Sequence, residues 1–171
     1  DTPVTSFSLS SINDTFAERF SVLSFKVKDA GGDAIATKID QIKIAISGTG
    51  GNASTDIAWA GLYKTGVTDP IATVTSPGAG ITNAYLTFGS EPNANSTAAL
   101  DSVADNTLTE YTVHIYMKGQ GNKLTATEGM TYAFVTNEDL VGADLGASSK
   151  MVIVNTNKVA LVTATISVVI T

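Results

Sequence analysis

The side chains best suited to chemistry are few in this sequence, and their spacing matches no common catalytic motif. The only His is His114. A Ser-His-Asp triad would need it, yet no Gly-x-Ser-x-Gly elbow is present. The absence of Cys excludes thiol catalysis and Cys-based zinc sites, and a single His falls short of the several ligands that catalytic zinc requires. We predict that His114 is a partly exposed residue in mid-strand, on the face shared with Thr112 and Tyr116.

Acidic residues offer the other route to catalysis, because a pair of carboxyl groups can hydrolyse a glycosidic bond. Most candidates fall in expected loops or at strand ends, where acids are usually solvated, and no spacing pairs any two of them. The candidates are Glu91, Asp101, Glu110, Glu128, Glu138 and Asp139. We therefore predict that the chain is not an enzyme and needs no cofactor.

Two further patterns each allow a binding and a structural interpretation. Asp29 and Asp33 flank a Gly-Gly turn, with Asp40 further on, so they could bind Ca²⁺ or simply cap turn amides. Trp59 and Tyr63 share one face of a predicted strand. They could stack on a sugar, but we expect them to be core residues.

Three Asn residues match the N-glycosylation pattern: Asn13, Asn52 and Asn95. In a chain this rich in Ser and Thr, a few such matches are expected by chance.

The elements that must position these residues are strands, because apolar residues recur with a period of two. The clearest cases are residues 19–28, 42–46, 108–118 and 159–170. In the third, Tyr111, Val113, Ile115 and Met117 share one face. Shorter candidates are residues 4–12, 57–64, 71–76, 85–88, 130–136 and 151–154. Such alternation is typical of half-buried strands.

Turn residues separate these segments, and little of the sequence favours helix. Gly, Asn, Asp and Pro cluster at 29–33, 48–55, 75–80 and 118–122. Only residues 96–103 and 137–146 could form a helical turn or two. The sequence predicts an all-β fold: a two-sheet β-sandwich, Ig-like or jelly roll, of about nine or ten strands. We expect residues 13–171 to form one domain, preceded by an N-terminal strand at 1–12.

The composition and the net charge limit where the protein can act and which classes of partner it can bind. Charged residues make up 15% of the chain, against about 25% in a typical soluble domain, which fits a hydroxyl-rich secreted protein or a subunit covered by its own copies. The net charge of −6 and the scattered basic residues argue against nucleic acid, and no apolar run has the length of a membrane span. The chain begins Asp1-Thr2-Pro3 without an initiator Met. We therefore expect export after removal of a signal peptide, and an extracellular or cell-surface location.

The ends of the chain carry the strongest functional hypothesis. Both residues 4–12 and 159–170 are strand-like, and they could pair as ordinary edge strands within the sandwich. Alternatively, a terminal strand could complete the sheet of the next subunit, which is donor-strand complementation. Because such head-to-tail exchange does not close, it propagates a filament. We expect the N-terminal strand to be the donor, with the C-terminal strand as the second choice.

Some stretches resemble known modules. Residues 20–29, 31–33 and 37–44 look like the opening of Ig-like or jelly-roll modules in prokaryotic surface proteins, and residues 111–118 and 132–135 resemble their second half. In organisation the chain is similar to TasA-like biofilm-matrix fibre subunits and archaeal bundling-pilus subunits, which insert an N-terminal strand into a neighbour. By that resemblance the donor residues would be Val4, Phe7, Leu9 and Ile12.

We therefore expect a structural homopolymer subunit whose main partner is itself, with other surface or matrix components as possible additional partners. Two alternatives stay open: a monomeric carbohydrate-binding or adhesin module, and a Ca²⁺-dependent S-layer or matrix protein.

Overall fold

The structure is a computed structural model that describes most of the chain. It covers residues 6–9, 14–29, 34, 36–49, 52–89, 99–118, 130–135, 139–140, 149–153, 159–163 and 166–170. Side chains are described for residues 14–29, 34, 36–44, 46, 52–89 and 99–118.

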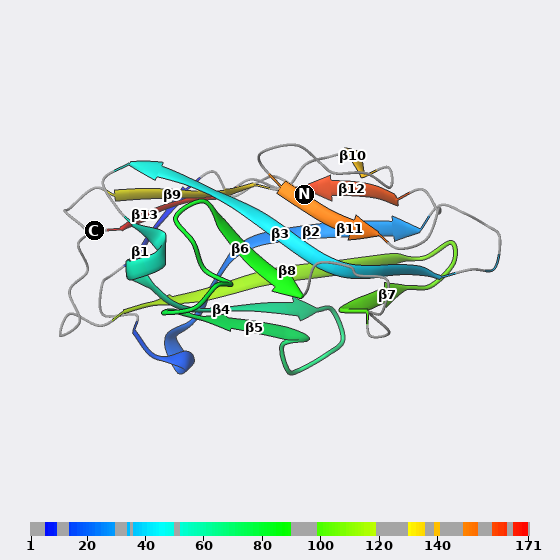
Figure 1. Ribbon diagram of the computed structural model, residues 1–171, viewed down its shortest axis with the longest axis horizontal. Helices are drawn as coiled ribbons and strands as arrows, with labels where there is room; N and C mark the ends of the chain where they lie inside the picture. The colour runs from blue at the N-terminus through cyan, green and yellow to red at the C-terminus, as the bar shows by residue number, and fades with distance from the viewer. Residues whose placement is uncertain are drawn as a thin grey trace.

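Two sheets face each other and form a β-sandwich (Figure 1). The six-stranded sheet has the order β10-β12-β2-β8-β4-β5, and the seven-stranded sheet is built around the long strand β3. The first contains β2 (Phe20–Asp29), β4 (Ile57–Lys64), β5 (Ala72–Thr75), β8 (Leu108–Met117), β10 (Asp139–Leu140) and β12 (Val159–Thr163). The second contains β1 (Ser6–Leu9), β3 (Thr37–Thr49), β6 (Tyr85–Gly89), β7 (Asp101–Val103), β9 (Met130–Val135), β11 (Ser149–Ile153) and β13 (Ile166–Ile170).

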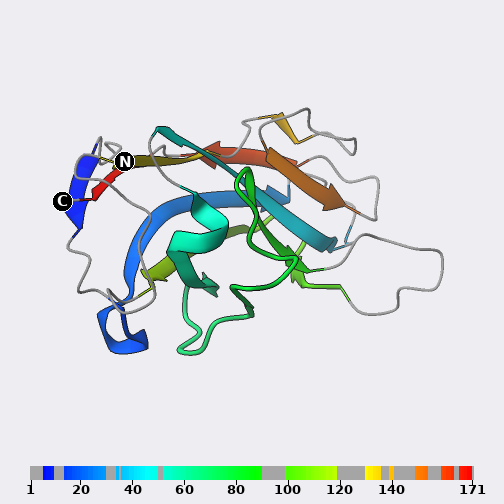
Figure 2. The same ribbon diagram turned by 60° about the vertical axis from the view of Figure 1, so that its left-hand side comes forward.

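Among the strands that the structure describes, all pairs are antiparallel except one. The N-terminal strand β1 lies at the end of the seven-stranded sheet and pairs in parallel with β13, from Ser6 opposite Ser167 to Leu9 opposite Ile170. Figure 2 shows these two strands, blue and red, side by side at one end of the molecule. β13 in turn pairs with β9 on its other side.

The core lies between the sheets and comes from the alternating residues that the sequence singled out. Leu23, Phe25 and Val27 of β2 pack with the inward face of β8, and every apolar residue of that face is buried. The inward residues of β8 are Tyr111, Val113, Ile115 and Met117, and those of β3 are Ile42, Ile44 and Ile46. Their burial confirms the two-sheet all-β fold.

A bulge in β3 explains why its apolar residues break the strict period of two. Ile39 and Ile42 are both fully buried, although three positions separate them, because the register with β11 shifts between their partners. Gly89 of β6 lies against this site with a φ of +82°, and a Cβ there would overlap the carbonyl oxygen of Asp40. Only Gly suits that position, since a side chain disfavours this backbone region.

Several details differ from the sequence-based expectation. The predicted strand at 159–170 is wrong as a single element, because β12 belongs to one sheet and β13 to the other. Residues 101–103 form β7 and residues 139–140 form β10, so the suggested helical turns are wrong at these residues, and residues 96–98, 137–138 and 141–146 lie outside the described residues. With these changes, thirteen strands are found in the described part of the chain, against ten in the prediction. Helix is confined, in the described residues, to the 3₁₀ turn η1 (Phe16–Glu18) and to α1 (Ala53–Asp56).

No helix among the described residues is long and apolar enough to cross a membrane.

Candidate functional site on the outer face of the six-stranded sheet

The polar and aromatic residues of β4 and β8 gather on the face of the six-stranded sheet that points away from the core. Opposite residues in the two strands include Trp59 with Tyr116, and Gly61 with His114. In β8 these residues alternate with the buried Val113, Ile115 and Met117, so they point to the other side of the sheet. His114 is half-buried on the face that it shares with Thr112 and Tyr116, which confirms its predicted position.

Trp59 is the centre of this outer face. Its indole stacks on the Tyr116 ring, with centroids 5.6 Å apart and planes inclined by 12°, and meets the Phe16 ring edge-on at 5.2 Å. It also lies over Gly61, where an added Cβ would overlap the indole. Trp59 is therefore only 7% exposed, yet it stands apart from the main core between the sheets. Its burial agrees with our expectation, but the burial occurs on the outer face.

A short turn from the N-terminal side covers this surface. The carboxylate of Glu18 accepts hydrogen bonds from the backbone N–H of Thr15 at 3.2 Å and from its Oγ1 at 2.7 Å, which closes η1. The Thr15 hydrogen bond also lowers the pKa of Glu18. The turn projects Phe16, which is 48% exposed, and Arg19 over the sheet.

Arg19 lies between the Phe16 ring and the rings of Tyr63 and His114. Its guanidinium lies 4.1 Å from the Phe16 ring centroid and 5.7 Å from that of Tyr63, and Nη1 donates to the Phe16 carbonyl oxygen at 2.9 Å. The ring centroids of Tyr63 and His114 are 4.7 Å apart. We call the set of Phe16, Arg19, Trp59, Tyr63, His114 and Tyr116 the outer aromatic cluster.

Three buried polar atoms of this cluster have no hydrogen-bond partner among the described residues. They are Arg19 Nε, Tyr63 Oη and His114 Nδ1, and in that part of the chain they are the only such side-chain atoms. Burial, and then the positive charge of Arg19, lowers the pKa of His114, so the imidazole is neutral at pH 7. Buried polar atoms are usually paired, so the outer aromatic cluster is the least satisfied polar region among the described side chains.

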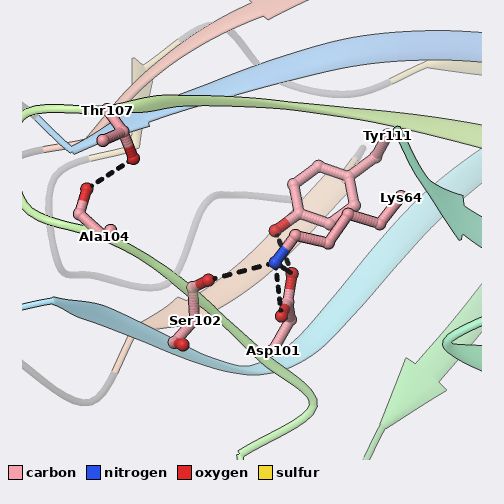
Figure 3. A network of polar contacts seen from close by, with 6 residues as sticks. All are labelled: Lys64, Asp101, Ser102, Ala104, Thr107 and Tyr111. Atoms are coloured by element: carbon pink, nitrogen blue, oxygen red, sulfur yellow. Dashed lines mark hydrogen bonds and ion pairs between the residues drawn. The ribbon is translucent and has the colours of Figure 1, made fainter. Parts of the chain in front are cut away.

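The core side of the same two strands carries a polar network that is closed. Lys64 of β4 donates to Asp101 of β7 at 2.9 Å, and the buried phenol of Tyr111 donates to the other carboxylate oxygen of Asp101 at 2.6 Å (Figure 3). Lys64 also reaches the Ser102 carbonyl oxygen at 3.3 Å. Burial and the neighbouring carboxylate raise the pKa of Tyr111. This network links the two sheets and uses Asp101 structurally.

The remaining acidic candidates fall into separate places. Glu110 lies 3.9 Å from Lys26, and Asp101 belongs to the network above, so these two acids face different basic partners. For Asp139 only the backbone of β10 is described, and Glu91, Glu128 and Glu138 lie outside the described residues.

The Asp-rich turn after β2 is organised by Asp29. Its buried carboxylate accepts hydrogen bonds from the backbone N–H and Oγ1 of Thr37 at 2.8 and 2.7 Å. This is the amide-capping role offered as one interpretation of the turn. Asp40 is also buried, Asp33 lies outside the described residues, and the described part of the chain has no group of three potential metal ligands.

The other predicted sites are only partly described. Asn52 precedes α1 and accepts a 2.7 Å hydrogen bond from Ser54 of its own Asn-x-Ser motif, whereas Asn13 and Asn95 lie outside the described residues. Among the predicted donor residues, Phe7 and Leu9 lie in β1 opposite Val168 and Ile170. Val4 and Ile12 lie outside the described residues.

Sequence reasoning identified His114, Trp59 and Tyr63 but missed the contributions of Phe16 and Arg19. The Thr15 and Glu18 spacing of a capping box was a signal that a turn begins there, although nothing in it shows which face the turn covers. In comparisons with known proteins, no protein-family model, curated protein or solved structure matches this chain.

Proposed function

We propose that this protein is a non-enzymatic structural subunit of an extracellular filament, in which β1 of one copy completes the sheet of the next copy. The observation that carries this proposal is the position of β1. It is a four-residue strand at the end of the sheet, and among the described strands it pairs along one edge, with β13. In the same part of the chain this is the one parallel pair, and parallel pairing is slightly weaker per residue than antiparallel pairing.

Few contacts are lost when this strand pairs with another copy instead of with its own chain. Each register pair, such as Phe7 with Val168, can form between two chains with the same main-chain hydrogen bonds that it has within one. Phe7 and Leu9 are two residues apart, so they lie on the same face of the strand, as alternate anchoring residues do in β-augmentation. The exchange is head-to-tail, so it propagates along an open chain of subunits.

The C-terminal strand is the less favourable donor. β13 pairs with β1 on one side and with β9 on the other, from Ile166 opposite Phe134 to Ile170 opposite Met130. Withdrawing β13 would break two ladders, whereas withdrawing β1 breaks one. The sheet order therefore supports the N-terminal strand as the donor.

The test is negative-stain electron microscopy of the purified chain beside donor-strand variants. We expect fibres from the unmodified chain and single particles from Phe7→Asp and Leu9→Asp, because a charge on the anchoring face prevents docking. Ser8→Asp is the matched control on the alternate face and should retain fibres. Equal fibre formation by all four proteins, or by a chain lacking residues 1–12, would contradict the proposal.

The burial of Trp59 weighs against the alternative of a monomeric sugar-binding module. Stacking on a sugar needs a free aromatic face, but the indole is only 7% exposed, with Tyr116 stacked on it and Phe16 in a T-shaped contact. The structural role therefore remains the better supported function.

A further inference from the structure

The chain's only Arg, only His and only Trp meet in the outer aromatic cluster, although they come from three separate segments. Arg19 follows η1, Trp59 lies in β4 and His114 in β8. Two Tyr residues and an exposed Phe complete the group. Trp, Tyr and Arg are the residues most enriched at binding hot spots, which are small clusters that carry most of an interface's affinity.

The three unpaired polar atoms determine which chemical group this surface could bind. Arg19 Nε–H can only donate, Tyr63 Oη can donate, and His114 Nδ1 donates when its ring carries the proton there. An ionised carboxylate is the matching group, since it only accepts and offers two oxygens with about four lone-pair positions. Hydrogen bonds from Arg to carboxylate are also among the strongest in proteins.

We propose that the outer aromatic cluster is a second contact between copies of this chain, in which a carboxylate of a neighbouring copy binds Arg19 and Tyr63 beside His114. This inference rests on the proposed homopolymer, because it deepens that function by naming a side-chain contact that accompanies strand exchange.

Charge complementarity supports a second copy as the occupant. The chain has 16 acidic and 10 basic residues and a net charge of −6, so each copy presents many carboxylates. Arg19 is the one basic side chain of the cluster, Glu18 lies in the same turn, and in the described residues the Arg19 Nε has no acceptor. A guanidinium with an open Nε–H attracts a carboxylate of an acidic neighbouring copy.

The turn that carries Phe16 and Arg19 over the sheet leaves room for a carboxylate to bind. Phe16 and Arg19 belong to one short turn, joined by the Nη1 hydrogen bond to the Phe16 carbonyl, and Phe16 is half exposed. A rotamer change of the half-buried Arg19 side chain turns Nε outward without disturbing the strands. Tyr63, on β4, is held on the rigid sheet below.

The experiment measures the critical concentration for polymerisation of full-length variants. Arg19→Gln removes the charge and the Nε donor, and should raise this concentration about tenfold, whereas Tyr63→Phe removes one hydroxyl and should raise it about threefold. The control on the same face is Lys26→Gln, which removes a basic residue that lies near Glu110 and outside the cluster. It should polymerise like the unmodified chain.

The outcomes separate this inference from the proposed function. If the unmodified chain forms fibres but Arg19→Gln and Tyr63→Phe show its critical concentration, the side-chain contact is wrong and strand exchange stands. If no protein forms fibres, sedimentation equilibrium of the unmodified chain decides: self-association that Arg19→Gln abolishes supports the contact, and a monomer at all concentrations overturns it. Retention on immobilised saccharide that requires Arg19, with self-association unchanged, also overturns it.

Discussion

Two polar clusters occupy opposite faces of the same pair of strands, and they differ in how fully their hydrogen bonds are made. On the core side, Asp101 accepts hydrogen bonds from Lys64 and Tyr111. On the outer side, Tyr63 and His114 each keep a buried polar atom without a partner among the described residues. A cluster that serves only stability closes its hydrogen bonds, because an open buried group costs about 1–3 kcal/mol. The outer cluster therefore has fewer of its hydrogen bonds made, among the described residues, than the core-side network.

The largest effect should come from breaking the closed network. Asp101→Ala leaves the Lys64 charge and the buried Tyr111 hydroxyl without their acceptor, and should lower the free energy of unfolding by about 2–3 kcal/mol. Complete loss of a fully buried pair would cost more, but the Lys64 and Asp101 side chains are 26% and 15% exposed. Urea denaturation measures the change. Asp101→Asn, which keeps one acceptor, should lose less, and a loss below about 1 kcal/mol in Asp101→Ala would contradict this description of the network.

The next effect tests whether Trp59 lies on the outer sheet surface as described. A Cβ at Gly61 would overlap the indole, so Gly61→Ala should destabilise the fold by about 2 kcal/mol. Trp59→Phe places a smaller ring above the same position. In the double variant we expect the two effects to be less than additive, since the smaller ring relieves the overlap. Strict additivity in thermal unfolding would show that the indole lies elsewhere.

A matched pair of Tyr→Phe variants compares the two faces directly. Tyr111→Phe removes a hydroxyl that donates to Asp101, and should cost about 1–2 kcal/mol of stability. Tyr63→Phe removes a buried hydroxyl that has no partner in the described part of the chain, so stability should stay the same or rise slightly. The urea midpoints of the two variants, compared with that of the unmodified chain, measure these two changes in stability. Equal losses would mean that the two clusters do not differ as described.

The smallest effect concerns pH. The folded protein binds a proton on His114 less tightly than the unfolded chain, because burial and Arg19 lower its pKa from 6.5. The contribution of His114 to stability is therefore complete above pH 6.5 and is lost as the pH falls through the lowered pKa. His114→Gln should flatten this part of the stability profile between pH 7 and pH 5. An unchanged slope in that variant would assign the pH dependence to other groups.

The sequence predicted most of the core because alternation reports directly on which face a strand buries. Val113, Ile115 and Met117 were correctly assigned in this way. It could not show that residues 159–170 change sheets, since β12 and β13 keep the same alternation in both environments. Likewise, β7 is three residues long, too short to show any period, and its pairing with β3 decides its conformation.

The candidate site was predictable only in part. Trp59 and Tyr63 share a face by their spacing, and His114 was placed correctly on its strand. The period of a strand does not reveal whether a face points to the other sheet or away from it, so the location of Trp59 outside the main core could not be foreseen. The approach of Arg19 depends on how η1 folds back over the sheet, which is a long-range contact that local patterns do not encode.

Disulfide trapping can show whether β1 pairs between copies, because the chain has no Cys of its own. Phe7 and Val168 are register partners in β1 and β13, so Cys residues at the two positions come close enough for a disulfide. Phe7→Cys and Val168→Cys are made in separate full-length chains, mixed under polymerising conditions and oxidised. If β1 exchanges between copies, we expect a disulfide-linked dimer that contains one copy of each variant. If the mixture yields no such dimer, while the variant carrying both Cys residues closes its disulfide only within single chains, strand exchange is contradicted.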